Sequence, residues 1–192
     1  MAQVKKSQVR DAILRSAFDL FSTRGYANTS LPQIAKAAGT SPPNVYVYFE
    51  SKFEILYTVF EPWLRRQFLE LEQELLNIEE PRERLRHLFR VVFKEIPERQ
   101  NGFANNIMQA LSTATPEDHY QPTLINWMTA RLRDMILSTL PPERRAAVDT
   151  DGLYHFFVMA LDGYISYWRL SQDKGFDEAT SEQLCRFLLG EP

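Results

Sequence analysis

Side chains suited to binding nucleic acid gather in the stretch GTSPPNVYVYFESK, residues 39–52. The carboxamide of Asn44 has a donor and an acceptor side by side, so it can pair with N6 and N7 of an adenine. The hydroxyls of Tyr46 and Tyr48 can donate to phosphate oxygens, and so can the ammonium of Lys52. These residue types at this close spacing predict a surface that reads a base and holds the flanking backbone.

The local pattern of this stretch is compatible with two structures. Residues 45–49, VYVYF, alternate β-branched and aromatic side chains, which is typical of a half-buried strand. No second convincing strand occurs in the sequence, however, and a lone strand has no partner for its hydrogen bonds. We therefore expect a short helix with Ser41 as its cap. It should begin at Pro43 and leave Pro42 outside, because a proline disfavours helical geometry in the residue before it.

The segments before this stretch have the signals of two helices. Apolar residues recur at helical spacing from about Val4 to Arg24, and Gly25 suits a left-handed C-terminal cap. The sequence Ser30-Leu31-Pro32-Gln33 is a capping box that starts a second helix over residues 31–38. Gly39 then begins a turn. A short helix, a turn and a further short helix form the layout of a helix-turn-helix.

The rest of the chain also has helical periodicity. A long helix is predicted to begin at Lys52, and Pro62 must kink or split it because proline lacks an N–H and clashes one turn back. The sequence predicts an all-α fold of about nine helices. It also predicts a helix-turn-helix domain at residues 1–51 and a larger helical domain at residues 52–192. Further helices are expected over about residues 81–96, 101–113, 120–140, 150–172 and 178–189.

Charge is divided unevenly along the chain, whose net charge is −3. Residues 1–52 hold seven basic and three acidic side chains, a net charge of +4, so the remainder carries −7. This asymmetry indicates that the N-terminal quarter meets a polyanion. Within it, Lys5 and Lys6 are expected to follow the nucleic acid as a mobile arm.

Composition excludes several classes of site. The single cysteine, Cys185, excludes an internal disulfide, and the histidines His87, His119 and His155 have no metal-ligand spacing. No apolar run reaches the roughly 18 residues of a membrane span, and the first residues lack the apolar core of a signal peptide. We expect a cytoplasmic protein with no cofactor, no metal and no membrane association.

The order of these signals resembles the tetracycline-repressor-like (TetR) family of transcriptional regulators, over about the first 55 residues. The resemblance implies a homodimeric, all-helical repressor that binds double-stranded operator DNA and is released from it by a small-molecule effector. Two successive prolines, Pro42 and Pro43, depart from the family pattern. The matching residues are Arg24-Gly25-Tyr26, Thr29-Ser30-Leu31, Ile34-Ala35, Ala38-Gly39, Tyr46, Tyr48-Phe49 and Ser51-Lys52.

The helix-turn-helix layout predicts which residues face DNA, because the N-terminal residues of a recognition helix lie near base edges. Asn44 is the candidate for base readout, Pro43 can touch a thymine methyl, and Lys52 at a helix N-terminus suits a phosphate. Val45 and Phe49 are expected to pack inward. The expected DNA-binding residues are Thr29, Ser30, Lys36, Ser41, Pro43, Asn44, Tyr46, Tyr48 and Lys52.

Most aromatic residues lie beyond residue 52, where we find no catalytic constellation, nucleophile elbow or phosphate-binding glycine loop. A cavity for a small, largely apolar or aromatic effector is therefore expected, although aromatic residues at helical spacing are also typical of a plain core. Arg131, beside Trp127 and Met128, would suit a carboxylate. The expected ligand-binding residues are Phe89, Phe93, Phe103, Asn106, Ile107, Trp127, Met128, Arg131, Tyr154 and Phe157.

A two-fold operator requires a dimer, and its interface is expected in a four-helix bundle made by the last two helices of each subunit. Packing within one subunit is the alternative for each candidate. The expected interface residues are Ala160, Leu161, Gly163, Tyr164, Trp168, Leu184 and Leu188.

Two classes of function are compatible with these patterns. In the first, an effector moves the helices around Phe93 and Trp127, and Pro62 lets the long helix pivot until the two reading heads no longer match successive major grooves. Activation in place of repression is a variant of this class. In the second, the chain is an all-helical enzyme or small-molecule-binding protein in which the helix-turn-helix is incidental.

Overall fold

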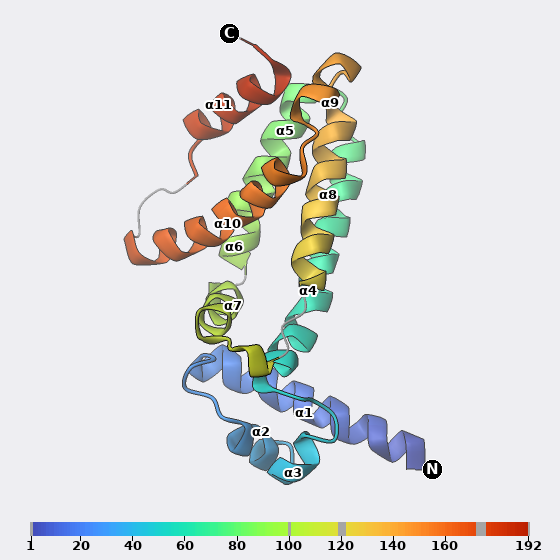
Figure 1. The fold of residues 1–192 in the computed structure, drawn as a ribbon, viewed down its shortest axis with the longest axis vertical. Coiled ribbons are helices and arrows are strands. Elements are labelled where there is room, and N and C mark those ends of the chain that lie inside the picture. Colours follow the sequence, from blue (N-terminus) through green and yellow to red (C-terminus); the bar gives the residue numbers. More distant parts are fainter. Residues whose placement is uncertain (1, 100, 119–121, 172–175, 192) are drawn as a thin grey trace. The chain divides into compact units, whose positions relative to one another are not determined.

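The computed structural model describes residues 2–99, 101–118, 122–171 and 176–191 (Figure 1). Within these ranges it describes all side chains except those of residues 2–5, 99, 101–104, 117, 151 and 165–171. Most of the described residues lie in helices and none lies in a strand, which confirms the predicted all-α fold. Within the part of the chain that the structure describes, no helix is long and apolar enough to cross a membrane.

The helices divide between two compact units. The first unit comprises residues 1–64 and 101–121, and the second comprises residues 65–100 and 122–192. The first holds α1 (Ala2–Arg24), α2 (Leu31–Ala37), α3 (Pro42–Val45), the start of α4 (Lys52–Leu76), α7 (Asn101–Thr113) and the 3-10 turn η2 (Pro116–Asp118). The second holds the rest of α4, α5 (Pro81–Arg90), the π-helical segment η1 (Val91–Glu95), α6 (Ile96–Arg99), α8 (Thr123–Thr139), α9 (Pro142–Val148), α10 (Asp151–Ser171) and α11 (Glu178–Leu189).

In the first unit, α2 packs on both α1 and α3, and α7 packs on α1. Gly25 ends α1 with φ of 80° and Gly39 follows α2 with φ of 66°, a region that glycine adopts without strain. The unit is larger than the predicted domain of residues 1–51, because it also includes the start of α4 and all of α7. The buried apolar residues that join these helices include Ile13, Ala17, Phe21, Ile34, Val45, Phe49 and Ala110.

The recognition segment is helical, as the tertiary argument predicts. The helix α3 begins at Pro42, however, so the expected start at Pro43 is wrong. Both prolines fit in the first turn because the first N–H groups of a helix have no partner inside it. The amides of Asn44 and Val45 donate to the Ser41 carbonyl, at 3.0 and 3.2 Å, and the helical turns continue as far as Phe49, whose N–H donates to the Val45 carbonyl.

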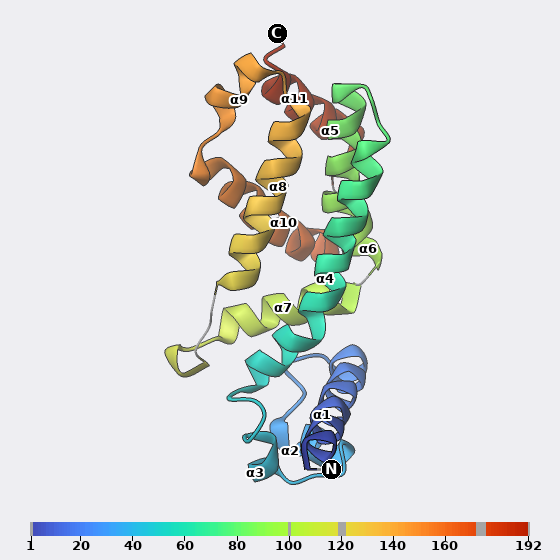
Figure 2. The ribbon, with the colours of Figure 1, turned by 90° about the vertical axis from the view of Figure 1, so that its right-hand side faces the viewer.

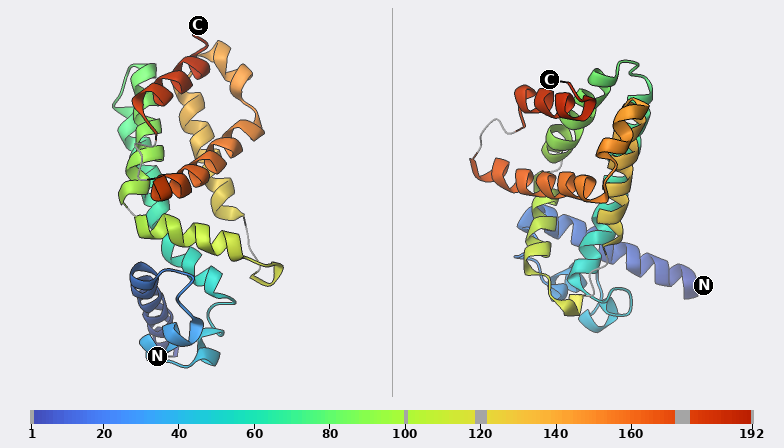
Figure 3. Two further views of the ribbon diagram at one scale, coloured as in Figure 1. Left: turned by 90° about the vertical axis from the view of Figure 1, so that its left-hand side faces the viewer. Right: turned by 45° about the horizontal axis from the view of Figure 1, so that its top comes forward.

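In the second unit, the end of α4 runs alongside α5 and α8, and α10 lies across these helices (Figure 2). The same crossing of α10 over α5 and α8 is visible from two further directions (Figure 3). The N–H of Glu54 donates to the Ser51 hydroxyl at 3.1 Å, so Ser51 caps α4. The helix α4 continues through Pro62 without a break, so of the two predicted outcomes the proline does not split it.

Candidate nucleic-acid interface

The outward face of the recognition segment is formed by Pro43, Asn44 and Val47. Pro43 is exposed, Asn44 is half-buried and Val47 is 62% exposed. Val45 and Phe49 lie on the opposite side and are buried, as expected. The face therefore has one hydrogen-bonding side chain between two apolar ones.

The carboxamide of Asn44 is held in place by Thr40, a residue that the sequence analysis did not single out. Asn44 Nδ2 donates to Thr40 Oγ1 at 2.7 Å. One hydrogen of the amide nitrogen and the whole of Oδ1 are not used in this contact, and these are the groups that pair with N7 and N6 of adenine. Thr40 precedes the cap residue Ser41 and lies outside α3, so helical spacing does not predict this contact.

Several expected DNA-binding residues lie on the surface of the first unit. Ser30, Lys36 and Ser41 are exposed, Tyr46 is 58% exposed and Tyr48 is half-buried. Their hydroxyl and ammonium groups are of the types that contact phosphate.

Two other expected DNA-binding residues have partners inside the protein. Thr29 is buried, and its Oγ1 donates to the Gly25 carbonyl at 2.8 Å. Lys52 Nζ donates to the carbonyls of Tyr26 and Thr29, both at 2.9 Å, and lies 3.9 Å from the centre of the Tyr26 ring. Both residues hold the loop between α1 and α2, and their expected contacts with phosphate stay a prediction. A loop carbonyl accepts hydrogen bonds as a phosphate oxygen does, so the sequence does not show which of the two acceptors Thr29 and Lys52 contact.

The surroundings of Lys52 alter two pKa values. Burial lowers the pKa of the Lys52 ammonium, and the carboxylate of Asp118 opposes this shift. Burial, together with the Asp118 charge, raises the pKa of the Tyr26 phenol to about 12. Lys52 is therefore a partly desolvated cation that depends on the loop carbonyls for its hydrogen bonds.

Replacing Lys52 by methionine is expected to lower the free energy of unfolding by about 1 to 2 kcal/mol. The two hydrogen bonds to the loop are lost, and the estimate is reduced because the side chain is half-exposed. Urea denaturation followed by circular dichroism measures the change. Lys36→Met, at an exposed position, is the matched control and should leave stability within about 0.5 kcal/mol of the wild type. If Lys52→Met kept full stability and only reduced the salt dependence of DNA binding, Lys52 would act on phosphate and not on the loop.

Asn106 was expected to bind ligand, but the structure gives it a role inside the first unit. Its side chain is 1% exposed. Asn106 Oδ1 accepts a hydrogen bond from the Tyr26 N–H at 2.6 Å, and Nδ2 donates to the Phe21 carbonyl at 3.0 Å. One turn later on α7, Gln109 Oε1 accepts from the Ala27 N–H at 3.1 Å. These amides satisfy the N–H groups of Tyr26 and Ala27 just after α1, and they give the Phe21 carbonyl a second hydrogen bond beside the one from the Gly25 N–H at 3.1 Å.

The other ligand-binding candidates divide between the two units. Ile107 is half-buried in the first unit, and the side chain of Phe103 lies outside the described residues. In the second unit, Phe89 lies 6.2 Å from Phe93 and 5.8 Å from Phe157, measured between ring centres. All three rings are at least 96% buried and form an aromatic core.

Phe176, which the sequence analysis did not single out, joins this aromatic core. Its ring is stacked on Phe93, with the ring centres 4.8 Å apart and the planes inclined by 17°. Phe93 also meets the edge of Tyr164, at 6.4 Å. Phe93 lies in the π-helical segment η1, and π-helical turns often occur at functional sites.

Trp127 and Arg131 form a second group in this unit. The guanidinium carbons of Arg65 and Arg131 lie 4.3 and 5.8 Å from the centre of the Trp127 ring, which also contacts Phe68. Arg131 pairs with Glu72 at 3.4 Å, so its guanidinium already has a carboxylate partner. The neighbouring Met128 is buried.

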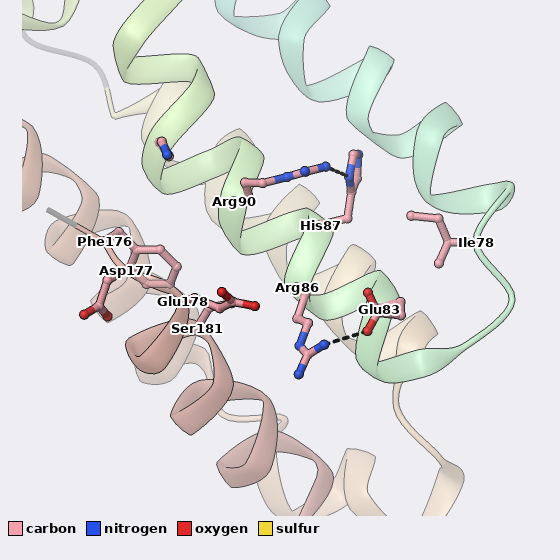
Figure 4. Close-up of a pocket in the computed structure, with 10 residues that line it drawn as sticks. Ile78, Glu83, Arg86, His87, Arg90, Phe176, Asp177, Glu178 and Ser181 are labelled. Atoms are coloured by element: carbon pink, nitrogen blue, oxygen red, sulfur yellow. Dashed lines mark hydrogen bonds and ion pairs between the residues drawn. The ribbon is translucent and has the colours of Figure 1, made fainter. Parts of the chain in front are cut away.

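A groove of about 590 Å³ lies between α5, η1 and the start of α11 (Figure 4). Three cationic side chains, Arg86, Arg90 and Lys94, line it together with three carboxylates, so the groove has no net preference for an anion. Figure 4 shows Arg86 paired with Glu83 and Arg90 in contact with His87. Phe176 also lines this groove, and it therefore links the groove to the aromatic core.

A second groove, of about 600 Å³, lies between α8 and α10. It is lined mainly by apolar groups, including Phe156 and Met159. Tyr154, an expected ligand-binding residue, lines it as well. The buried Tyr154 hydroxyl and Thr129 Oγ1 have no hydrogen-bond partner among the described residues.

The expected dimer residues do not form one exposed surface. Leu161 and Leu188 are buried within the second unit, so for these two the alternative of packing within one subunit is correct. Ala160, Tyr164 and Leu184 are half-buried, Gly163 is exposed, and the side chain of Trp168 lies outside the described residues. Three large apolar residues missed by the sequence analysis are exposed, namely Phe156 at 64%, Met159 at 61% and Phe187 at 59%.

Comparison with known proteins places this geometry in context. Residues 13–58 match the model of "Bacterial regulatory proteins, tetR family". In Mycolicibacterium smegmatis, the regulator EthR is 40% identical over 55 residues, which are 29% of this chain and 25% of EthR. The activator FasR of the same organism is 28% identical over 101 residues, 53% of this chain and 46% of FasR. The chain thus spans about a quarter to a half of the length of these relatives.

Solved structures resemble the chain over most of its length. FadR of Thermus thermophilus, a TetR-family repressor in complex with lauroyl-CoA, is 23% identical with a TM-score of 0.67, over 94% of this chain and 92% of FadR. FadR of Bacillus subtilis, in complex with stearoyl-CoA, is 18% identical with a TM-score of 0.62, over 95% of this chain and 99% of FadR. At these identities the similarity shows a shared fold.

Proposed function

We propose that this chain, which carries the DNA-binding domain of the tetR family of bacterial regulatory proteins, is a ligand-responsive, DNA-binding transcriptional regulator. In the form we favour, it is a dimeric repressor that a small, largely apolar or aromatic effector releases from operator DNA. The observation that carries the proposal is the outward face of Pro43, Asn44 and Val47 on a helix-turn-helix within residues 13–58, the range that matches that family. A recognition helix presents its first residues to base edges in the major groove, and Asn44 lies at that end.

The phosphate contacts of such a complex would come from exposed groups around this face. The exposed candidates are Ser30, Lys36, Ser41 and Tyr46, and Tyr48 is a half-buried one. The net charge of +4 over residues 1–52 favours association with a polyanion. Because phosphate contacts release counterions, binding should weaken steeply as salt is raised.

A homodimer would bring two reading heads to the two halves of an operator. The exposed side of α10 supports this proposal, because Gly152, His155, Phe156, Met159 and Gly163 all lie on it at helical spacing and are exposed. On α11, Phe187 is exposed as well. Exposed apolar residues arranged on one face are typical of a surface that a partner covers, here a second copy of the chain.

The variant Phe156→Glu is expected to be monomeric at concentrations where the wild type is a dimer. A carboxylate at the centre of an apolar interface would lose its hydration without gaining a partner. Sedimentation velocity over a dilution series measures the change. Leu76→Glu, which is 72% exposed on α4, is the control and should associate like the wild type. Equal masses for wild type and Phe156→Glu at every concentration would contradict this interface.

The effector would act in the second unit. We propose the region of Phe93 and Phe176, where a buried aromatic core reaches the groove between α5 and α11. The two FadR structures were solved with acyl-CoA thioesters, which supports an effector with a long apolar part for this chain too. Effector binding must favour the form that binds DNA poorly, or no release occurs.

Two segments that join the compact units would carry a movement caused by the effector to the reading head. The helix α4 belongs to both compact units, and their boundary in it, between Leu64 and Arg65, comes two residues after Pro62. The helix α7 follows α6 in the chain and holds the loop at Tyr26 through Asn106. A shift of α6 or a bend at Pro62 would therefore change the position of the reading head.

The proposal is tested by selecting duplexes from a random library with the full chain and measuring their affinity at several salt concentrations. We expect selected sites with two-fold symmetry and a steep loss of affinity with salt. A thermal-shift screen of acyl-CoA thioesters, fatty acids and aromatic acids would then be run with and without the selected DNA. A hit that stabilises the free protein but not the complex would support release by that compound. Absence of sequence-specific, salt-sensitive binding would favour the enzyme or binding-protein alternative.

Activation is the second candidate. The relative that matches over 101 residues, FasR, is an activator, whereas another, KstR2 of Mycolicibacterium smegmatis, is a repressor that is 32% identical over 90 residues. A reporter gene placed downstream of the selected site distinguishes repression from activation. Expression should rise when the chain is deleted if it represses, and fall if it activates.

A further inference from the structure

We propose that Val47 is a specificity-determining residue that packs on the 5-methyl group of a thymine, next to the base pair read by Asn44. This inference rests on the proposed function, because it assigns what the outward face of the recognition segment recognises in DNA. The class of partner is a duplex whose half-site presents an adenine to Asn44 and a thymine methyl to Val47.

The backbone places Val47 on the same face as Asn44. The N–H of Val47 donates to the Asn44 carbonyl at 3.3 Å, one helical turn back, and the N–H of Tyr46 donates to the Pro42 carbonyl at 3.4 Å. Side chains three and four residues apart share a helical face, so Pro43, Asn44 and Val47 point the same way. Val45 and Phe49 are 0% and 2% exposed, which fixes the opposite side as the buried one.

The side chain of Val47 remains largely exposed in the first unit. Val47 is 62% exposed, and its neighbour Tyr46 is 58% exposed. A single exposed valine is ordinary on a protein surface. Here, however, it lies one turn from the only side chain of the face that can form a hydrogen bond, on a module matched to a DNA-binding family. The position is that of a base-contacting residue, and the side chain has no polar group to offer.

Only one base presents an apolar group in the major groove. Guanine offers N7 and O6, cytosine and adenine offer amino groups, and thymine offers its C5-methyl group beside O4. An aliphatic side chain placed against a polar base edge would remove water from that edge without replacing its hydrogen bonds. Val47 therefore discriminates in favour of thymine by contact with the methyl group and against the other bases by desolvation.

Thr40 positions the polar member of the same face. Because Thr40 Oγ1 accepts from Asn44 Nδ2 at 2.7 Å, the carboxamide is fixed with its oxygen and its second amide hydrogen available. This pair matches N6 and N7 of adenine. Side chains one turn apart are about 5 to 6 Å from each other at Cβ, and base pairs rise by about 3.4 Å. The thymine read by Val47 is therefore one or two base pairs from the adenine.

The test uses the full chain and a duplex selected from a random library, in which each thymine of one half-site is replaced in turn by deoxyuridine. This exchange removes only the 5-methyl group. One methyl group is worth about 0.8 kcal/mol when buried, so one position should lose affinity about fourfold. Val47→Ala should lose a similar factor on thymine DNA and should lose nothing further on the deoxyuridine duplex, because the methyl contact is already absent.

Two controls separate this contact from general effects. Lys36→Ala should weaken binding to thymine and deoxyuridine duplexes by the same factor, because a phosphate contact does not depend on the base. Val47→Thr, which keeps the shape and replaces one methyl group by a hydroxyl, should fold like the wild type at this exposed position and show a reduced preference for thymine.

The outcomes distinguish the inference from the function on which it rests. Specific, salt-sensitive binding without any deoxyuridine effect would keep the proposed function and overturn the role of Val47. An equal loss for Val47→Ala on thymine and deoxyuridine duplexes would also overturn it. Failure to select any specific duplex would overturn the proposed function and this inference together.

Discussion

Replacing Asn106 by leucine is expected to lower the free energy of unfolding by about 2 to 4 kcal/mol. The exchange keeps the approximate size of the side chain but leaves the Tyr26 N–H without its partner, and the Phe21 carbonyl keeps only its hydrogen bond from the Gly25 N–H at 3.1 Å. A buried backbone group that loses its partner costs about 1 to 3 kcal/mol, and the loss of one of the two hydrogen bonds of the Phe21 carbonyl adds to this cost. Asn106 is 1% exposed, so water does not replace the lost bonds without a local opening. Urea denaturation of the full chain, at one protein concentration, measures the loss.

Gln109→Leu is the matched control on the same helix. Gln109 accepts one hydrogen bond, from the Ala27 N–H, and this contact is exposed to solvent. Its loss should cost no more than about 1 kcal/mol, because water can take the place of the side chain. If Asn106→Leu were no less stable than Gln109→Leu, the buried amide would not be what holds the end of α1.

The same variant also tests how α7 supports the reading head. Asn106 holds the backbone at Tyr26, and Lys52 holds the carbonyls of Tyr26 and Thr29 from the other side of the loop. Ser30, the residue that caps α2, follows directly. Loosening this loop should weaken binding to every duplex alike, at a temperature where the variant is still folded. A loss confined to particular sequences would point instead to an altered contact at the base edges.

The helix-turn-helix could be predicted from the sequence because its signals are local. The start of α2 depends on residues three apart, and the Ser30 N–H does donate to Gln33 Oε1 at 2.8 Å. Gly25 and Gly39 mark the helix ends through their own backbone preference. The predicted start of α3 was wrong by one residue. A proline disfavours helical geometry in the residue before it, but this preference did not keep Pro42 out of the first turn, where a missing N–H costs no hydrogen bond.

The roles of Asn106, Lys52 and Thr29 could not be predicted, because their partners are not local. Asn106 and Tyr26 are 80 residues apart in the chain, and Lys52 and Tyr26 are 26 apart. A polar side chain on a helix has the same local pattern whether it meets a ligand, a phosphate or a backbone group. Only the tertiary structure shows that a free carbonyl or N–H lies within reach.

The faces of the last two helices show a related limit. Apolar periodicity identified α10 and α11, but Leu161 and Leu188 are buried while Phe156 and Phe187 are exposed. On a helix that is apolar over much of its circumference, periodicity does not say which side meets the rest of the subunit. That choice depends on the neighbouring helices, here α8 for α10 and α5 for α11.

Replacing Phe89 by alanine is expected to lower the free energy of unfolding by about 3 to 5 kcal/mol, the largest effect that we predict. Phe89 is 0% exposed, and its ring contacts Phe93, Phe157 and Phe176. Removing a buried ring costs its transfer free energy and leaves a cavity that the neighbours fill only in part. The rings of Phe93 and Phe176 also lose an aromatic partner, worth about 0.5 to 1.5 kcal/mol for each pair. The measurement is again urea denaturation at a fixed protein concentration.

Leu76→Ala is the control in the same compact unit, because Leu76 is 72% exposed and should change stability by no more than about 0.5 kcal/mol. The cavity left by Phe89→Ala offers a further check, since benzene or indole should bind in it and restore part of the lost stability. A loss below about 1 kcal/mol, with no response to either compound, would show that Phe89 is not part of a packed core. Phe89 would then return to the role of a ligand contact. A loss in the expected range supports a role for Phe89 in the packed core and leaves the edge of the core, where Phe176 lines the groove, as the effector contact that we propose.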